Sequence, residues 1–532
     1  MTADERCGSW YRGGVLAGVL TATLAASPAA ARPFTGAAAL VRVYDAILDA
    51  DFTKAETLLE DTCPPAPEEA CLVLDATQLL WQIQLDPEQT RHDTAFSERV
   101  ARAIDAAEAW VSREPDDAEA WFYLGGAYGA RVQWRVLRQQ QLAAARDGKR
   151  IKQAMEQALR LDQTLEDAQF GLGLYEYYAA VAPAAARMFR WLLFLPGGDR
   201  ETGLARMQRT QQRGILLGGE AGYQLHLIYL WYEKRPQDAL GLLRRLSGKY
   251  PGNPLFLRLI GDTEDAYLHD RAASLSTYRT LLDRARTKRV HEPALAETDA
   301  RLRIARVLDA LGDTDLAIAE LTALVDADPQ APYLASLDAR LALASADART
   351  GDWTRAEALF REVIARAPSG DPHGLAALAR RGLSRKPDET KARAYGASLQ
   401  AWRRFEKSGP DADVEEALER ALTSDPQNAM IRYRYGRVLA ARVPSGSTSP
   451  QAQEAVRLIE DALQSNGLPP TMAADAALAA GRLREQLHEP ARAIEHYRRA
   501  ANLFGGAADT RAAAARALAR LQRDPAPRGR LD

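Results

Sequence analysis

The chain contains 532 residues, of which 69 are basic and 71 acidic, and its formal net charge is −2. A chain of nearly balanced charge lacks the basic surface that nucleic-acid binding requires, so we expect no nucleic-acid partner. Its length exceeds what one hydrophobic core supports, which leaves several domains or a repeat array. Alanine, leucine and arginine are abundant and no segment shows sustained period-two alternation, so we predict helices rather than sheets.

Residues 1–31 have the layout of a secretory signal peptide. Arg6 and Arg12 precede an apolar run over residues 13–26, and residues 29–31 are three alanines that suit cleavage. Acidic residues near the start, together with the length of the run, keep an uncleaved membrane anchor open as the alternative. A cleaved signal peptide predicts a periplasmic or secreted protein.

Two cysteines, Cys63 and Cys71, remain after such cleavage. In an oxidising compartment an even pair at this spacing predicts a disulfide that joins the end of one helix to the start of the next. The alternative is two free, partly buried thiols. We expect no zinc site here, because seven residues separate the cysteines and no histidine lies nearby.

A helical-hairpin pattern recurs along most of the chain. Residues 121–128 read W-x2-L-G-x2-Y, and a second pattern of a small residue, a large apolar residue four positions on and a later proline begins at Ala239, Ala317 and Ala356. These residues resemble the two helices of the tetratricopeptide repeat (TPR) superfamily. The resemblance implies an all-α fold, a TPR-like helical-hairpin solenoid that winds as a right-handed superhelix.

We expect the solenoid to form two halves. Residues 37–286 are predicted to be a divergent N-terminal TPR-like helical domain, and residues 296–521 a C-terminal TPR-repeat domain, because the pattern breaks at residues 287–293. A basic insertion over residues 131–150 interrupts the first clear unit. Residues 522–532 are rich in proline and arginine and are predicted to be a disordered tail.

A narrower resemblance rests on three segments, which cover residues 190–204, 229–233 and 250–254. They are similar to exported bacterial TPR proteins of unassigned function. The Gly-Asp-Arg-Glu and Gly-Leu residues within 198–204 are distantly similar to the inclusion-body-clearance TPR family. The resemblance implies the fold and a binding or adaptor role, and it carries no catalytic residues.

Candidate partner-binding residues lie in the first half of the chain. Residues 121–232 hold 16 of the 38 aromatic residues, and we expect most of them to fill the core between repeats while one set lines a groove. A cationic stripe at helical spacing suits an acidic partner or a carboxylate, although a solvated helix face is the ordinary interpretation. The residues that we select as candidates are Arg131, Trp134, Arg135, Arg138, Tyr175 and Tyr178.

The sequence contains no catalytic, cofactor-binding or metal-binding motif. His226 lies within the aromatic-rich segment, and a structural role is expected for it because no nucleophile adjoins it in sequence. We expect no enzyme, cofactor or metal.

Three hypotheses for function follow. The first is an exported, non-catalytic scaffold that binds a protein or peptide on its concave face, for instance in envelope assembly. The second is a structural protein at the membrane surface or cell wall, attached through its N-terminus or through the apolar residues 187–195. The third is an enzyme with a site in the aromatic-rich half.

Overall fold

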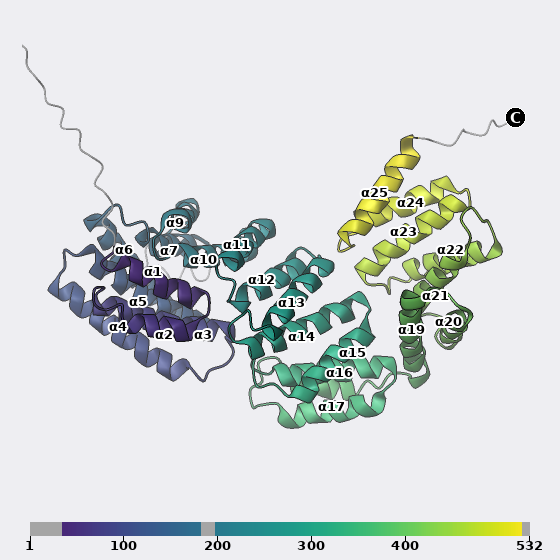
Figure 1. Ribbon diagram of the computed structural model, residues 1–532, viewed down its shortest axis with the longest axis horizontal. Coiled ribbons are helices and arrows are strands. Elements are labelled where there is room, and N and C mark those ends of the chain that lie inside the picture. Colours follow the sequence, from purple (N-terminus) through teal and green to yellow (C-terminus); the bar gives the residue numbers. More distant parts are fainter. Residues whose placement is uncertain (1–33, 182–196, 524–532) are drawn as a thin grey trace, which may run out of the picture.

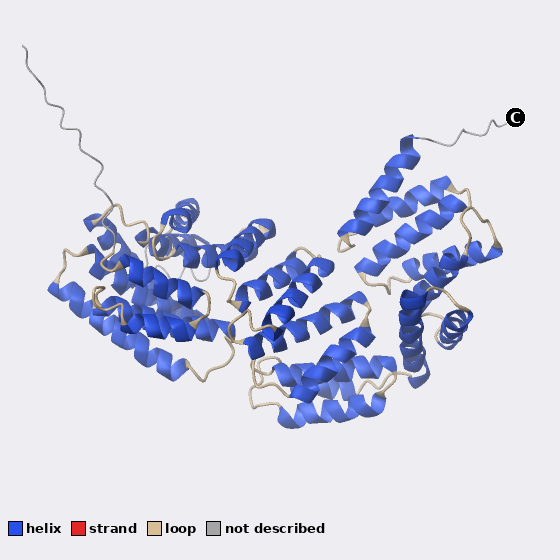
Figure 2. Ribbon diagram, in the orientation of Figure 1, coloured by secondary structure: helices blue, strands red, loops and turns tan. Residues whose placement is uncertain are grey.

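The computed structural model describes residues 34–181 and 197–523, and these residues form 24 α-helices and one π-helical turn. Figure 2 shows helices and connecting loops throughout the described ranges, which confirms the predicted all-α class. The predicted signal peptide, the apolar segment 187–195 and most of the predicted tail lie outside these ranges. Within the described ranges, no helix is long and apolar enough to cross a membrane.

The helices of the N-terminal half are α1 Ala37–Leu48, α2 Phe52–Glu60, α3 Glu68–Leu85, α4 Asp93–Arg113, α5 Ala118–Leu137, α6 Gln141–Leu161, α7 Ala168–Val181, α9 Arg200–Arg213, α10 Gly218–Trp231, α11 Pro236–Lys249, α12 Pro254–Asp262, the π-helical turn η1 Thr263–Tyr267 and α13 Arg271–Arg286. Those that follow are α14 Pro293–Leu311, α15 Thr314–Ala327, α16 Ala335–Thr350, α17 Trp353–Arg366, α18 Leu375–Leu383, α19 Glu389–Ser408, α20 Ala412–Ser424, α21 Ala429–Arg442, α22 Pro450–Gln464, α23 Pro470–Gln486, α24 Pro490–Asn502 and α25 Ala508–Arg523.

Small residues lie where the helices of a hairpin cross. Ala239, Ala317, Ala356 and Ala493 open the second-helix patterns, and each is fully buried. A methyl group at these positions lets two helices approach closely, while larger apolar residues fill the space between successive hairpins. The spacing read from the sequence therefore corresponds to the packing of the solenoid.

The basic segment 131–150 is not an insertion between two short helices, as the sequence analysis expected. It forms the end of α5 and the first half of α6, which continue the hairpin as two helices of 20 and 21 residues. The two helices remain paired because Arg131 and Arg135 of α5 both contact the buried carboxylate of Asp147 on α6. The lengthened hairpin explains why the spacing departs from 34 residues in this region.

One hydrophobic cluster runs from Phe34 to Ala379, and a second runs from Tyr433 to Ala514. Val290 is buried within the first cluster, so apolar packing continues through residues 287–293. The division of the chain into the ranges 37–286 and 296–521 stays a prediction about folding units.

In the N-terminal half, the first helix contacts residues about 200 positions later in the chain. Asn253 accepts a hydrogen bond from the amide of Leu255, which caps α12, and donates one of 2.7 Å to the carbonyl of Leu48 at the end of α1. Tyr250 donates to Asp45 on the same helix over 2.9 Å. The superhelix of the N-terminal half is thereby closed on itself.

A buried carboxylate occupies the interior of this closed half. Glu220 of α10 is only 3% exposed and accepts hydrogen bonds from Tyr44, Trp81, Gln133 and Gln224 over 3.1 to 3.4 Å. The first three donors belong to α1, α3 and α5, so one side chain joins four helices. Burial raises the pKa of Glu220, while the hydrogen bonds oppose that rise.

The rest of the chain forms an open arch. In Figure 1 it passes through α16 and α17, turns through α19 and α20, and returns so that α25 faces α13. A fully buried arginine, Arg434 of α21, donates to the carbonyl of Gly312 over 2.8 Å and to the hydroxyl of Ser398 over 2.9 Å. Its cation faces the negative C-terminal end of α14, which offsets part of the cost of burying the charge.

The structure joins Cys63 and Cys71 by a disulfide, in agreement with the predicted bridge. It spans the loop between α2 and α3. Closing this short loop restricts the unfolded chain and stabilises the hairpin.

The buried network yields a first prediction. Replacing Glu220→Ala removes the acceptor of three buried donors and of the half-buried Gln133, and each buried donor left without a partner costs roughly 1–3 kcal/mol. We expect hydrogen exchange to accelerate at least tenfold in α1, α3, α5 and α10, with little change in α21 to α25, measured by mass spectrometry. The control is Glu201→Ala, an exposed glutamate on α9. Equal exchange in the two variants would show that the network does not hold these helices together.

Candidate functional site

The predicted cationic stripe is engaged within the chain. Arg131 and Arg135 contact Asp147, and Arg138 pairs with Asp93 of α4 over 2.6 Å. Trp134 donates its indole N–H to the same Asp93 over 3.1 Å. Each of these side chains thus links neighbouring helices, and a role in binding a partner stays a prediction.

The two predicted tyrosines lie on α7. Tyr178 packs edge-on against the rings of Tyr177 and Tyr232, and burial raises its pKa. Tyr175 is half-buried beside Gly148 of α6. The proposed role of these tyrosines in binding stays a prediction.

His226 lies inside the N-terminal core. It is fully buried, donates from Nδ1 to the carbonyl of Tyr223 and packs against the Tyr223 ring. Burial disfavours the imidazolium and lowers the pKa of His226 to about 3. This environment is that of a structural histidine, the interpretation favoured by the sequence.

A concave pocket lies in the arch, outside the aromatic-rich half. Its volume is about 830 Å³, within the range of small-molecule and peptide pockets. Leu275, Leu311, Trp402, Tyr433 and Met472 supply its apolar and aromatic lining. They come from α13, α14, α19, α21 and α23, so five helices along the arch contribute to one site. We call this site the arch pocket.

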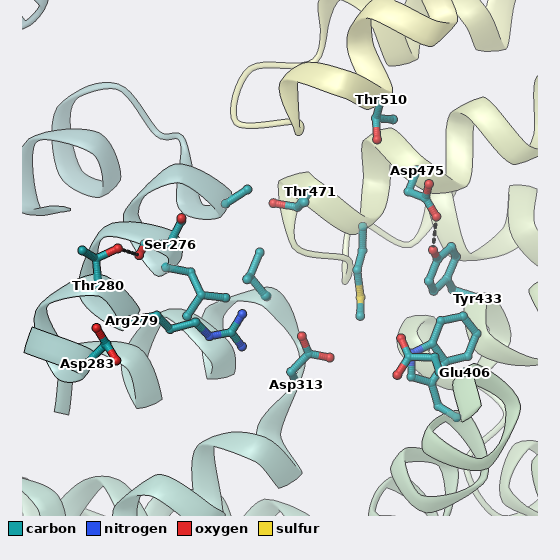
Figure 3. Close-up of a pocket in the computed structure, with 15 residues that line it drawn as sticks. Ser276, Arg279, Thr280, Asp283, Asp313, Glu406, Tyr433, Thr471, Asp475 and Thr510 are labelled. Atoms are coloured by element: carbon teal, nitrogen blue, oxygen red, sulfur yellow. Dashed lines mark hydrogen bonds between the residues drawn. The ribbon is translucent and has the colours of Figure 1, made fainter. Parts of the chain in front are cut away.

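Charged side chains stand around the arch pocket. In Figure 3, Ser276, Arg279 and Thr280 lie on one wall, while Thr471, Asp475, Tyr433 and Glu406 lie across the cavity. Asp475 accepts hydrogen bonds from Tyr433 and from Arg437, which holds that carboxylate at the wall. Arg279 makes no ion pair with any other described residue.

Carboxylates cluster at one side of the arch pocket. A single guanidinium, that of Arg403, contacts the carboxylates of Asp313, Asp315 and Glu406 over 2.5 to 2.9 Å, and Asp313 and Glu406 line the pocket. These carboxylates raise the pKa of Arg403, so it stays charged. The pocket therefore has a group of carboxylates on this side and the cation of Arg279 on the opposite wall.

The arch pocket was not predicted from the sequence. The predicted binding region was chosen by the density of aromatic residues, which is highest in residues 121–232, whereas the pocket is lined by two isolated aromatic residues, Trp402 and Tyr433. The position of Trp402 and Tyr433 within their repeat units could have indicated the pocket. Both lie on the helix that faces the interior of the arch, and only such helices can line a concave site.

A family model for the tetratricopeptide repeat matches residues 263–332. The chain contains tetratricopeptide repeats. This match confirms the predicted superfamily. One wall of the arch pocket belongs to the matched segment, because Leu275, Arg279, Leu311 and Asp313 lie within it.

The comparison with solved structures finds only low similarity to this chain. No curated protein matches it. Among solved structures, a Rap protein complexed with competence and sporulation factor is 14% identical, with a TM-score of 0.32 and coverage of 88% of this chain and 97% of that chain. Yeast Tom70 is 11% identical, with a TM-score of 0.26 and coverage of 92% and 97%. The TPR domain of P58(IPK) is 13% identical, with a TM-score of 0.20 and coverage of 80% and 98%.

The environment of His226 yields a second prediction. Because its folded pKa of about 3 is below its unfolded value near 6.5, the stability that depends on the neutral ring is present above pH 6.5. It is lost as the pH falls from 6.5 towards 3, by up to about 1.4 kcal/mol per pH unit. We expect His226→Gln to flatten this part of the curve of unfolding free energy against pH, measured by urea titration. Exposed His488→Gln serves as the control, and the idea fails if both variants keep the wild-type slope.

Proposed function

We propose that this TPR protein is a non-catalytic scaffold that binds an extended segment of a partner protein in the arch pocket. The single observation that carries the proposal is a concave cavity of about 830 Å³ lined by side chains from several helical hairpins. A solenoid presents such a surface because each hairpin contacts only its neighbours and leaves the inner face uncovered.

The lining supports a partner segment with at least one apolar side chain. The half-buried Leu275 and Leu311 provide aliphatic contacts, while Trp402 and Met472 are mostly buried and add a smaller accessible area. Aromatic and aliphatic residues at the centre of a concave patch are the usual source of binding free energy in protein interfaces. Polar side chains at the wall, such as Thr471 and Ser276, can pair with the backbone of an extended segment.

Charge supports a basic residue next to the apolar one. The carboxylates of Asp313 and Glu406 share the guanidinium of Arg403 with Asp315, so a lysine or arginine of the ligand can pair with them as a further cation.

The N-terminal half supports a different role in the same scaffold. Its interior is occupied by Glu220 and the four side chains that donate to it. We propose that this half is a rigid module that holds α13, the first wall of the arch pocket, in place.

The arch pocket yields a third prediction. Ser276 is exposed and lines the pocket, so Ser276→Trp fills the cavity without removing a core contact. The control is Ser408→Trp, at an exposed position outside the pocket. We expect a display library of random nonapeptides, selected on the wild-type protein, to enrich sequences that combine lysine or arginine with a large apolar residue. Fluorescence anisotropy should show binding weakened at least tenfold by Ser276→Trp and unchanged by the control.

Two results would contradict this function. Enriched peptides that bind the Ser276→Trp variant as tightly as the wild type would place the binding site elsewhere. Enrichment of acidic peptides would overturn the charge argument while leaving the location of the site intact.

We also propose that the protein is exported and acts in the periplasm or outside the cell, as a scaffold in envelope assembly. The layout of residues 1–31 and the bridge between Cys63 and Cys71 support this, because disulfides persist in oxidising compartments. A fourth prediction follows: the protein isolated from its native host begins at or near Arg32, as determined by N-terminal sequencing. A chain that retains Met1 and is recovered with the cytosol would contradict export.

A further inference from the structure

The two ends of the arch meet at one ring contact. Phe504, in the loop between α24 and α25, is 71% exposed, yet its ring centroid lies 4.6 Å from that of His269 in an edge-on arrangement. His269 lies in the loop between η1 and α13. Among the ring contacts of the described residues, this one alone joins the start of the arch to its end.

Gly505, which follows Phe504, also lies close to His269. A Cβ atom built at Gly505 would lie 4.0 Å from the Cβ of His269. The loop of Phe504 is held on its own side, because Thr471 at the start of α23 donates to the carbonyl of Gly505 over 3.3 Å. The two loops therefore belong to opposite ends of the arch and are not the two arms of one packed hairpin.

This meeting point lies at the mouth of the arch pocket. Leu275, Ser276 and Arg279 of α13 form the wall on the side of His269. Thr471, Met472 and Thr510 form the wall on the side of Phe504. Figure 3 shows the labelled residues of these two walls facing each other across open space. Separation of the two loops would move the walls apart and widen the pocket.

The contact is weak enough to break in the folded protein. Repeats in a solenoid contact only their neighbours, so small rotations at each hairpin from α14 to α24 add up at the ends of the arch. An edge-on pair of aromatic rings shifts an equilibrium by only about 2- to 13-fold.

We propose that His269 and Phe504 form a clasp that opens and closes the arch and so controls entry to the arch pocket. The clasp rests on contacts within the chain, and its role as a gate rests on the function proposed above for that pocket.

A designed crosslink tests the clasp without any ligand. The Cβ separation suits a disulfide between cysteines at positions 269 and 505, so the pair His269→Cys and Gly505→Cys should oxidise without denaturant in a Cys7→Ser background. The matched control is His269→Cys with Gly446→Cys, because Gly446 has the same positive φ of 78° and nothing within 4 Å. We expect the first pair to crosslink nearly completely and the control pair to stay reduced. Equal yields for the two pairs would overturn the clasp.

A distance measurement reports opening. Spin labels at Ala272→Cys on α13 and Asp509→Cys on α25 should give a short and a long population, and Phe504→Ala should enlarge the long one by a few fold. Leu378→Ala, at another exposed apolar position, should leave the distribution unchanged. A single short distance unaffected by Phe504→Ala would contradict an opening arch.

Binding kinetics separate the clasp from its role as a gate. The probe is a fluorescein-labelled nonapeptide of Lys-Leu-Ala repeated three times, followed by stopped-flow anisotropy. Oxidation of the 269–505 pair should slow association and dissociation at least tenfold, with reversal on reduction, and Phe504→Ala should accelerate both. Unchanged rates in a fully crosslinked protein would overturn gating. If the peptide binds no variant, the proposed function fails for this ligand class, while the crosslink and the distances still decide whether the clasp exists.

Discussion

The buried carboxylate of Glu220 is the interaction on which the shape of the molecule depends. A charge with almost no exposure is tolerated only when donors surround it, and Tyr44, Trp81, Gln133 and Gln224 all donate to it. These donors come from helices far apart in the chain, so satisfying the carboxylate holds α1, α3 and α5 against α10 and closes the coil. The interior of that coil is then filled by protein, and an accessible concave face is left to the arch.

A second buried charge shapes the arch. Arg434 has no carboxylate partner among the described residues and instead donates to Gly312 at the end of α14 and to Ser398 of α19. The guanidinium binds three repeats at one point, beneath the floor where Leu311 and Tyr433 line the arch pocket. Burial lowers the pKa of Arg434, and the helix end opposes that cost. Each half thus has a buried ionisable side chain where several helices meet. Glu220 lies in a filled interior, whereas Arg434 lies next to the open arch pocket.

The predicted binding residues show which contacts a single sequence does not reveal. The spacing of Arg131, Arg135 and Arg138 correctly indicates positions along one helix, and a free cationic face was the natural inference. Their partners, Asp147 and Asp93, lie on α6 and α4 and carry no signal of pairing in the sequence. A stripe of charge and a set of interhelical ion pairs look the same until the neighbouring helices are placed. The carboxylates of the arch pocket were invisible for the same reason.

The sequence by itself determined the all-α class, the repeated hairpin and the close approach at positions such as Ala317 and Ala356, because helix periodicity and side-chain volume are local properties. It also indicated the pair Cys63 and Cys71, since they are separated by a short loop. Only the tertiary structure decided which interior is filled and which is open. That decision depends on contacts such as those of Glu220 and His269 with residues up to 235 positions away, whose free energy is set by burial and geometry that spacing along the chain does not encode.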